Sequence, residues 1–241
     1  MDILIGLALA PALVLLYYVY KKDTVEHEPI GLVLRMFVLG AVGIIPAILL
    51  EMAAGGAIEA NIPAGFQQVV ISNFLGVALI EEAVKFFVLS RVAKRPEFNY
   101  VFDGIVYGVA VALGFAALEN VLYVMEGGVG TAVSRAIFAV PGHCADGVIM
   151  GCFFGLAHKY KNLGQRSNYL SFMFLALFVP VIEHGLYDSA LSFGSDAFAT
   201  AALVFDIVFI IIAMVVVKKT AKRDEPLDSE PPESHTIDLP E

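Results

Sequence analysis

Long apolar stretches separated by short polar or Gly/Pro-containing breaks run along nearly the whole chain. A helix of about 20 apolar residues is long enough to cross the hydrocarbon core of a bilayer. Such stretches lie at 2–20, 30–51, 67–91, 101–125, 131–157, 168–190 and 197–217. The pattern predicts an all-α fold, a polytopic transmembrane bundle of about seven spans that forms a single domain over residues 1–223.

Basic residues alternate between the two predicted sides of this bundle. The breaks at 52–66, 126–130 and 191–196 contain no Lys or Arg. Twelve of the 15 basic residues lie after the first, third, fifth and last stretches: Lys21, Lys22, Arg91, Lys94, Arg95, Lys159, Lys161, Arg166, Lys218, Lys219, Lys222 and Arg223. By the positive-inside rule this predicts an outside N-terminus, a cytoplasmic C-terminus and an odd number of spans.

The composition excludes a water-soluble fold. The chain is 59% hydrophobic and only 16% charged, whereas soluble domains contain about 25% charged residues. We therefore expect a multi-pass protein of the cell membrane. Much of the net charge of −9 falls after Arg223, and the acidic, Pro-rich segment 224–241 is predicted to be a disordered cytoplasmic tail. Cys144 and Cys152 are predicted to be free thiols.

Several ionisable residues fall inside the predicted spans. Each charged side chain costs about 2.5–3.5 kcal/mol at the centre of a membrane helix. These residues therefore need to pair with one another or to contact water or a metal. Arg35, Arg135, Asp146 and Asp206 are isolated in their stretches or near an end, and we interpret them as structural. The others are Glu81, Glu82, Lys85, Glu119, His143, Glu183, His184 and Asp188.

Glu81, Glu82 and Lys85 form an EExxK pattern in the third stretch. Spacings of three and four residues place the lysine on the same helix face as both acids. One carboxylate can then be neutralised locally while the other remains available for chemistry. The simpler interpretation, a buried ion pair, has about equal weight on this pattern alone.

Two strips of small residues accompany Glu119 and His143. Helical steps back from Glu119 reach Ala116, Ala112, Gly108 and Gly104, and steps of four after His143 reach Gly147, Gly151 and Gly155. Strips of this kind let helices approach each other closely in membranes. His143 is therefore expected to face a neighbouring helix.

Helical rise predicts that these groups lie at similar depths. At about 1.5 Å per residue, His184 and Glu119 lie roughly 9 Å, His143 roughly 18 Å and Glu81 roughly 20–22 Å from the outer end of their spans. Two imidazoles and a carboxylate suit Zn²⁺, with a remaining glutamate as base. A glutamate and two histidines can also hydrolyse a bond without metal. Asp188, one turn after His184, can orient its imidazole.

Four ordered motifs carry a resemblance to a known family. They are Glu81–Lys85, the segment from Phe102-Asp103-Gly104 to Glu119-Asn120, Pro141-Gly142-His143, and His184–Asp188. The chain resembles the PrsW family of intramembrane proteases, relatives of type II CAAX prenyl endopeptidases and of bacterial immunity proteins that share their fold. The resemblance implies hydrolysis of a peptide bond at the membrane, often the first cut of an anti-sigma factor on its extracytoplasmic side.

The sequence thus predicts an intramembrane endopeptidase. The expected catalytic residues are Glu81, Glu82, Glu119, His143 and His184. Lys85, Asn120 and Asp188 are expected to support them, and Glu119, His143 and His184 are the predicted ligands if Zn²⁺ is used. Glu81 is favoured as the base, although Lys85 can pair with either glutamate.

The expected partners are the lipid bilayer and a membrane-anchored protein substrate, and no nucleic acid. Two alternatives stay open, a catalytically silent scaffold or immunity protein of the same fold and a proton-coupled transporter. A transporter would favour an inverted repeat, and the sequence has none that we detect.

Overall fold

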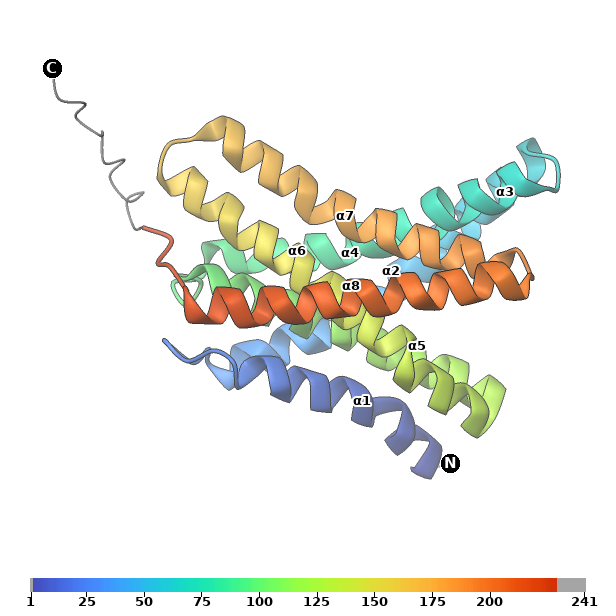
Figure 1. Cartoon of the computed structure of the whole chain (residues 1–241), viewed down its shortest axis with the longest axis horizontal. Coiled ribbons are helices and arrows are strands. Elements are labelled where there is room, and N and C mark those ends of the chain that lie inside the picture. The colour runs from blue at the N-terminus through green and yellow to red at the C-terminus, as the bar shows by residue number, and fades with distance from the viewer. Residues whose placement is uncertain (1, 229–241) are drawn as a thin grey trace, which may run out of the picture.

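The computed structural model describes residues 2–228, and these form a helical bundle (Figure 1). Its helices are α1 (Asp2–Tyr20), α2 (Ile30–Asn61), α3 (Phe66–Ile71), α4 (Leu79–Leu89), α5 (Val101–Ile137), α6 (Ala139–Asn162), α7 (Arg166–Ser192) and α8 (Asp196–Lys222). A π-helix, Ser72–Ala78, joins α3 to α4, and a 3₁₀ turn, Ser90–Lys94, follows α4. Within 2–228 the only β-type pairing is an isolated bridge between Tyr100 and Pro226.

Five helical stretches are long and apolar enough to cross a membrane. They are Ile3–Tyr20, Ile30–Asn61, Val101–Asn162, Arg166–Ser192 and Asp196–Lys222. The stretch Val101–Asn162 contains both α5 and α6, and the third predicted span is divided among α3, the π-helix and α4. The protein is therefore all-helical, with five such stretches among residues 2–228, and the count of seven spans stays a prediction.

The break predicted at 126–130 is a kink in a long helix. α5 continues past residue 125 to Ile137, and Gly128 alone has non-helical angles, with φ 73° and ψ −158°. Positive φ is accessible to glycine because it has no Cβ. The apolar pattern located this interruption, because two helical segments within α5 meet at Gly128.

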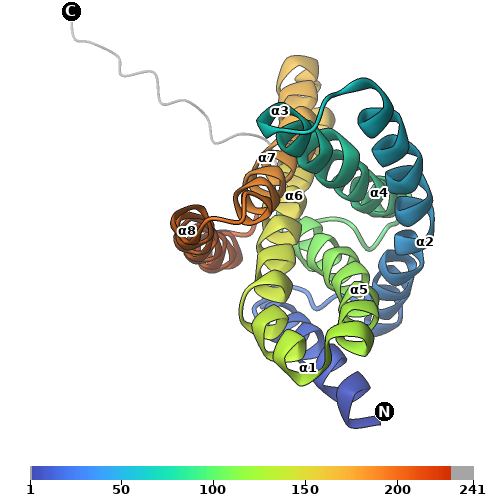
Figure 2. The same ribbon diagram turned by 90° about the vertical axis from the view of Figure 1, so that its right-hand side faces the viewer.

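α5 lies at the centre of the bundle. Every residue from Val101 to Ala117 is buried, and the helix packs against α1, α2 and α6. Figure 2 shows α5 between α2 and α6, with α8 on the opposite side of α6 and α7 from α4. A helix that is apolar on all faces is expected to occupy such a position.

The two predicted strips of small residues pack against each other. A Cβ placed on Gly104 would lie 2.4 Å from the carbonyl oxygen of Gly151, and one on Gly108 would lie 2.4 Å from that of Gly147. These distances leave no room for a side chain. The prediction of close helix contact is confirmed, and it fixes α6, with His143, against α5.

The beginning of the predicted tail is not disordered. Leu227 N donates to Asn99 O at 2.8 Å, Val101 N donates to Glu225 O at 3.1 Å, and Glu225 forms an ion pair with Lys159. Residues 224–228 thus pack against the start of α5, because free backbone groups there accept and donate hydrogen bonds. The rest of the predicted tail, 229–241, lies outside the described residues.

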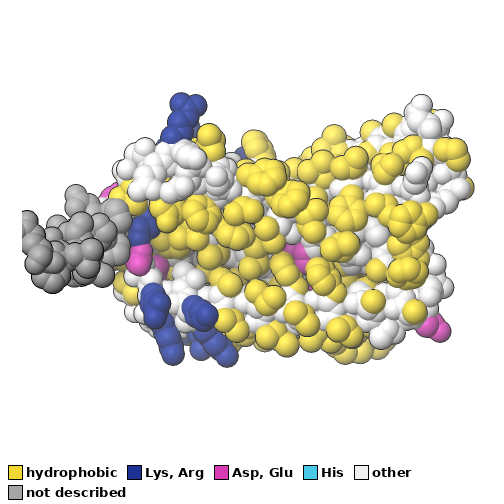
Figure 3. Space-filling model, turned by 45° about the horizontal axis from the view of Figure 1, so that its top comes forward, with side chains coloured by type: hydrophobic (Ala, Val, Ile, Leu, Met, Phe, Trp, Pro, Cys, Tyr) yellow, Lys and Arg dark blue, Asp and Glu magenta, His cyan; other side chains and the backbone are white. Residues whose placement is uncertain are grey.

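The surface agrees with a membrane-embedded bundle. Apolar side chains cover most of the face in Figure 3, and most of the Lys and Arg visible there gather toward the end where the C-terminal segment lies. α1 begins and α8 ends at opposite ends of the molecule (Figure 1). An odd number of crossings requires this placement.

Candidate active site

Glu81, Glu82 and Lys85 project from the first turns of α4, directly after the π-helix. Short π-helical segments occur frequently at functional sites because they change which side chains face a neighbour. Lys85 Nζ lies 2.7 Å from Glu82 Oε1 and 3.1 Å from Glu81 Oε2. Lys85 therefore pairs with both acids at once, where the sequence left the choice open.

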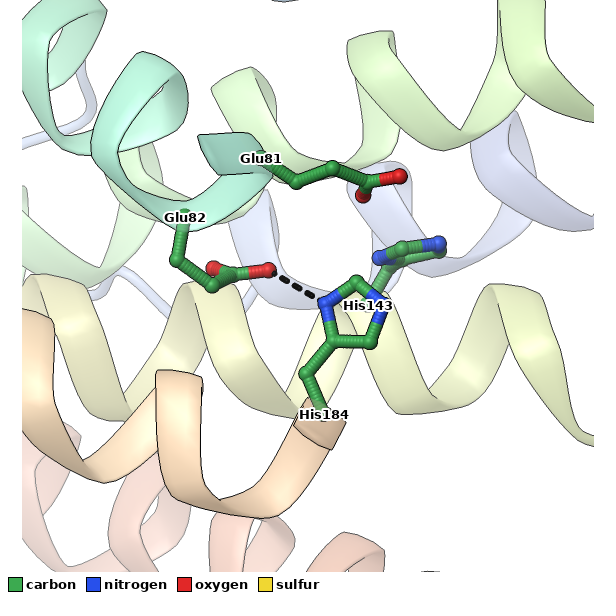
Figure 4. Close-up of side chains that lie close together, drawn as sticks. All are labelled: Glu81, Glu82, His143 and His184. Carbon is green, nitrogen blue, oxygen red and sulfur yellow. Dashed lines mark hydrogen bonds and ion pairs between the residues drawn. The ribbon is translucent and has the colours of Figure 1, made fainter. Parts of the chain in front are cut away.

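Two histidines from other helices complete this cluster. His143 on α6 and His184 on α7 have ring centroids 5.5 Å apart and nearly perpendicular rings. His143 Nδ1 lies 3.1 Å from Lys85 Nζ, and His184 Nδ1 lies 3.0 Å from Glu82 Oε1. Figure 4 shows both rings turned toward the glutamates. Glu81, Glu82, His143 and His184 are all buried. The helices α4, α6 and α7 therefore bring polar groups that are costly to bury to one point.

Glu119 contacts Arg135 as well as His143. Its Oε2 lies 2.7 Å from Arg135 Nη2 and 2.9 Å from His143 Nε2. Arg135, interpreted from the sequence as structural, is thus the counter-charge of a predicted catalytic residue. The spacing could not reveal this pair, because Arg135 follows the kink at Gly128 that turns the end of α5.

Asn120 and Asp188 hold other site residues in place. Asn120 Nδ2 donates to Ala8 O at 2.7 Å, and its Oδ1 accepts from Arg135 Nε at 2.8 Å. Asp188 Oδ2 lies 3.2 Å from His184 Nε2, the ring nitrogen opposite the one that contacts Glu82. These contacts hold neighbouring site residues in position, and the carboxylate of Asp188 can orient the imidazole of His184.

The residues with the geometry for a metal are not the predicted set. Glu81, Glu82, His143 and His184 each offer a ligand atom within 4.8 Å of the others, and Glu119 is not among them. Glu119 lies outside this group although its Oε2 contacts His143 Nε2. Two imidazoles and two carboxylates fit a zinc site by donor type, although Lys85 Nζ contacts the same donors.

A cavity of about 580 Å³ opens beside the cluster. Glu81, Glu119, His143, His184 and Asp188 line it; Glu82 does not. The lining also includes residues that the sequence interpretation missed or treated as structural, namely Glu51, Tyr123, Arg135, Asp146, Glu183, Tyr187 and Asp206. Glu51 was missed because it falls at the predicted end of the second span.

A helical bundle with buried carboxylates and imidazoles beside a cavity is typical of a class, membrane enzymes whose active site lies within the bundle. Residues 28–217 match the family described as PrsW family intramembrane metalloprotease. The chain belongs to this family. It is therefore an intramembrane peptidase, and the family description is consistent with a metal without identifying one.

Relatives named Protease PrsW cover most of the chain. The protein from Oceanobacillus iheyensis is 36% identical over 90% of this chain and 95% of its own length. That from Geobacillus kaustophilus is 42% identical over 77% of this chain and 78% of its own. That from Bacillus subtilis is 38% identical over 78% of this chain and 83% of its own. No solved structure matches the chain significantly.

Proposed function

We propose that this protein is an endopeptidase that cuts a membrane-anchored protein, such as an anti-sigma factor, near the outer face of the membrane. Seven spans with an outside N-terminus underlie the proposal. The alternation of basic loops supports this orientation, and the depth of Glu119 and His184 below the outer span ends supports an extracytoplasmic cut. Family membership supports peptide-bond hydrolysis as the reaction.

Glu81 is the proposed base, and one observation carries this choice. Glu81 lines the cavity, whereas Glu82 is fully buried outside it and is already bonded to Lys85 and His184. A water in the cavity can reach the Glu81 carboxylate, whereas Glu82 Oε1 is bonded to Lys85 and His184 and Glu82 Oε2 is buried. Glu82 then holds Lys85 and His184 in position.

The reaction balances with the groups present. Glu81 accepts a proton from water, the water oxygen bonds to the scissile carbonyl carbon, and the carbonyl oxygen becomes an oxyanion. His143 or His184 can donate a hydrogen bond to that oxyanion when its Nε2 exchanges its present contact, with Glu119 or Asp188, for the substrate oxygen. When the C–N bond breaks, the proton on Glu81 passes to the leaving nitrogen.

A metal would be held by Glu81, Glu82, His143 and His184, and Glu81 would then be a ligand instead of the free base. When bound, it supplies Lewis-acid polarisation of the carbonyl and lowers the pKa of a water. Because Lys85 Nζ contacts three of these residues, its ammonium and a metal compete for the same donor atoms. Asp188 and Glu119, bonded to the outer ring nitrogens, orient the two imidazoles.

The test substitutes the two glutamates separately, each by glutamine. With a co-expressed membrane-anchored substrate, Glu81→Gln should fold normally and reduce cleavage by about 10²–10⁴-fold. Glu82→Gln should lower both cleavage and thermal stability in detergent, because Lys85 and His184 lose a partner. Glu59→Gln, an exposed acid of α2, is the matched control. Cleavage that survives Glu81→Gln would reject Glu81 as the base, and loss of stability without any cleavage by the wild type would favour a silent scaffold.

A further inference from the structure

Three buried acids, one each from α6, α7 and α8, line the cavity. Asp146 on α6, Glu183 on α7 and Asp206 on α8 are 2%, 4% and 2% exposed. Each has a buried oxygen without a hydrogen-bond partner among the described residues: Asp146 Oδ1, Glu183 Oε1 and Asp206 Oδ2. Buried polar groups are normally paired, so these oxygens call for a ligand.

No basic side chain within 2–228 forms an ion pair with these three acids. The ion pairs of the site use Lys85 and Arg135 on Glu81, Glu82 and Glu119 instead. The cavity as a whole is lined by seven acidic residues against one arginine and two histidines. Acidic side chains thus outnumber basic ones in the lining, and burial favours the protonated form of a carboxyl group unless a cation compensates its charge. A cationic occupant would stabilise the ionised form of these acids, so the cavity favours a positively charged group.

The acids are placed to contact a substrate next to the catalytic cluster. Asp146 lies one turn after His143 on α6, and Glu183 directly precedes His184 on α7. Asp206 reaches the cavity from α8, which lies across α6 and α7 from α4 (Figure 2). A Cβ placed on Gly142 would lie 3.1 Å from Asp206 Oδ1, so the absence of a side chain at Gly142 leaves room for this carboxylate.

We propose that Asp146, Glu183 and Asp206 form a subsite that binds a lysine or arginine side chain of the substrate beside the scissile bond. The inference rests on the proposed function, because it assigns the same cavity to a peptide. Charged side chains bring hydrogen-bond donors to the orphaned oxygens, and charge-assisted bonds are about twice as strong as neutral ones. The substrate class is then a membrane-anchored protein with a basic residue in the cut segment.

The first experiment measures cleavage by the full chain in detergent. The reporters are membrane-anchored segments that differ only in having Lys, Gln or Glu at one position near the bond, scanned across four positions on each side. At one position the Lys reporter should be cut at least about tenfold more efficiently than the Gln reporter. Asp206→Asn should remove this advantage mainly by raising the KM of the Lys reporter. Asp196→Asn, an exposed acid of the same helix, should leave the cleavage of both reporters unchanged.

A binding measurement keeps the proposal testable without turnover. In the Glu81→Gln protein, fluorescence anisotropy should show the Lys peptide bound at least about tenfold more tightly than the Gln peptide, and Asp206→Asn should equalise them. The proposed subsite would be overturned if the Glu81→Gln protein bound the Lys and Gln peptides with equal affinity. Equal cleavage of the Lys and Gln reporters by the wild type would also overturn it. Cleavage that persists in Glu81→Gln would instead reject the proposed base, so the two failures are distinguishable.

Discussion

The ammonium of Lys85 contacts three of the four residues that meet at the site, and it also lies 4.4 Å from the centre of the Phe115 ring. It is 1% exposed. A buried ion pair often contributes little net stability, but removing one partner leaves the other charge without compensation. At the residue scale, the charge balance of the site therefore depends on this one side chain.

Substituting Lys85 should test that balance. Lys85→Met leaves two buried carboxylates without their shared cation, so we expect a loss of about 3–5 kcal/mol in the free energy of unfolding. Denaturant unfolding in detergent, with EDTA present, measures this. Lys94→Met, an exposed lysine just after α4, should change stability by less than about 0.5 kcal/mol. An unchanged Lys85→Met protein would show that Glu81 and Glu82 do not both carry charge.

Metal content should distinguish between two possible sets of ligands. The sequence predicts Glu119, His143 and His184, whereas the structure brings together Glu81, Glu82, His143 and His184. Elemental analysis of protein purified with saturating zinc should show that Glu119→Gln retains the metal and that His143→Ala and His184→Ala lose it. Glu119 contacts His143 from outside the cluster, and such a contact changes metal affinity by only about 10–100-fold. Loss of zinc from Glu119→Gln at saturation would return Glu119 to the ligand set.

At the scale of the elements, the contact between α5 and α6 determines where His143 lies. The carbonyl oxygen of Gly104 would be only 2.1 Å from a Cβ on Gly151. Because both partners at this contact are backbone, neither can move aside as a side chain would. The separation of the two helices is therefore set by the glycines themselves.

Gly151→Ala should separate α5 from α6. The added methyl group meets backbone, and overpacking of this kind costs typically about 1–3 kcal/mol or more. Thermal unfolding in detergent should show the loss, together with reduced cleavage. Gly130→Ala is the matched control, because a Cβ there meets nothing within 4 Å. Equal stability of the two variants would contradict close packing at Gly151.

The segment after α8 should respond to pH. Burial raises the pKa of Asp224 to about 7, and its Oδ1 accepts a hydrogen bond from Phe102 N at 2.9 Å. Between the ordinary pKa of 3.8 and about 7 the packed state holds more protons than the released state, so its stability falls as pH rises. Burial likewise raises the pKa of Glu28 to about 9, which acts in the same direction.

Hydrogen exchange measures this effect. After correction for intrinsic rates, protection of the Leu227 and Val101 amides should decrease between pH 5 and pH 8. Asp224→Asn should abolish the part of this decrease in protection that occurs near pH 7. Asp228→Asn, an exposed acid of the same segment, is the control. Protection that rises with pH would contradict the assigned direction.

At the scale of the whole molecule, the two termini of the described chain lie at opposite ends of the bundle (Figure 1). The third stretch passes through the bundle as three successive helical pieces, α3, the π-helix and α4. The proposed seven spans are then α1, α2, this third stretch, α5, α6, α7 and α8. Orientation then determines which cellular compartment supplies the substrate segment.

Cysteine labelling should test this orientation. Glu59→Cys, at the end of α2, should react with a membrane-impermeant maleimide in intact cells. Lys94→Cys, after α4, should react only after permeabilisation. The wild type, whose Cys144 is buried and Cys152 partly buried, gives the background. The reverse labelling pattern would invert the proposed topology.

The sequence determined the parts of this protein that depend on local physics. Apolar length predicted long helices, and glycine spacing predicted the faces on which α5 and α6 are closely approached by a neighbour, because these follow from bilayer thickness and side-chain volume. The high cost of ionisable groups in lipid identified Glu81, Glu82, His143 and His184 as residues that need partners.

Only the tertiary structure decided which partners they have. The pairing of Glu119 with Arg135 depends on the turn after Gly128. The cavity that Asp146, Glu183 and Asp206 share depends on how three helices converge. Spacing along one helix fixes a face but not its neighbour, so contacts between helices become visible only when the bundle is assembled.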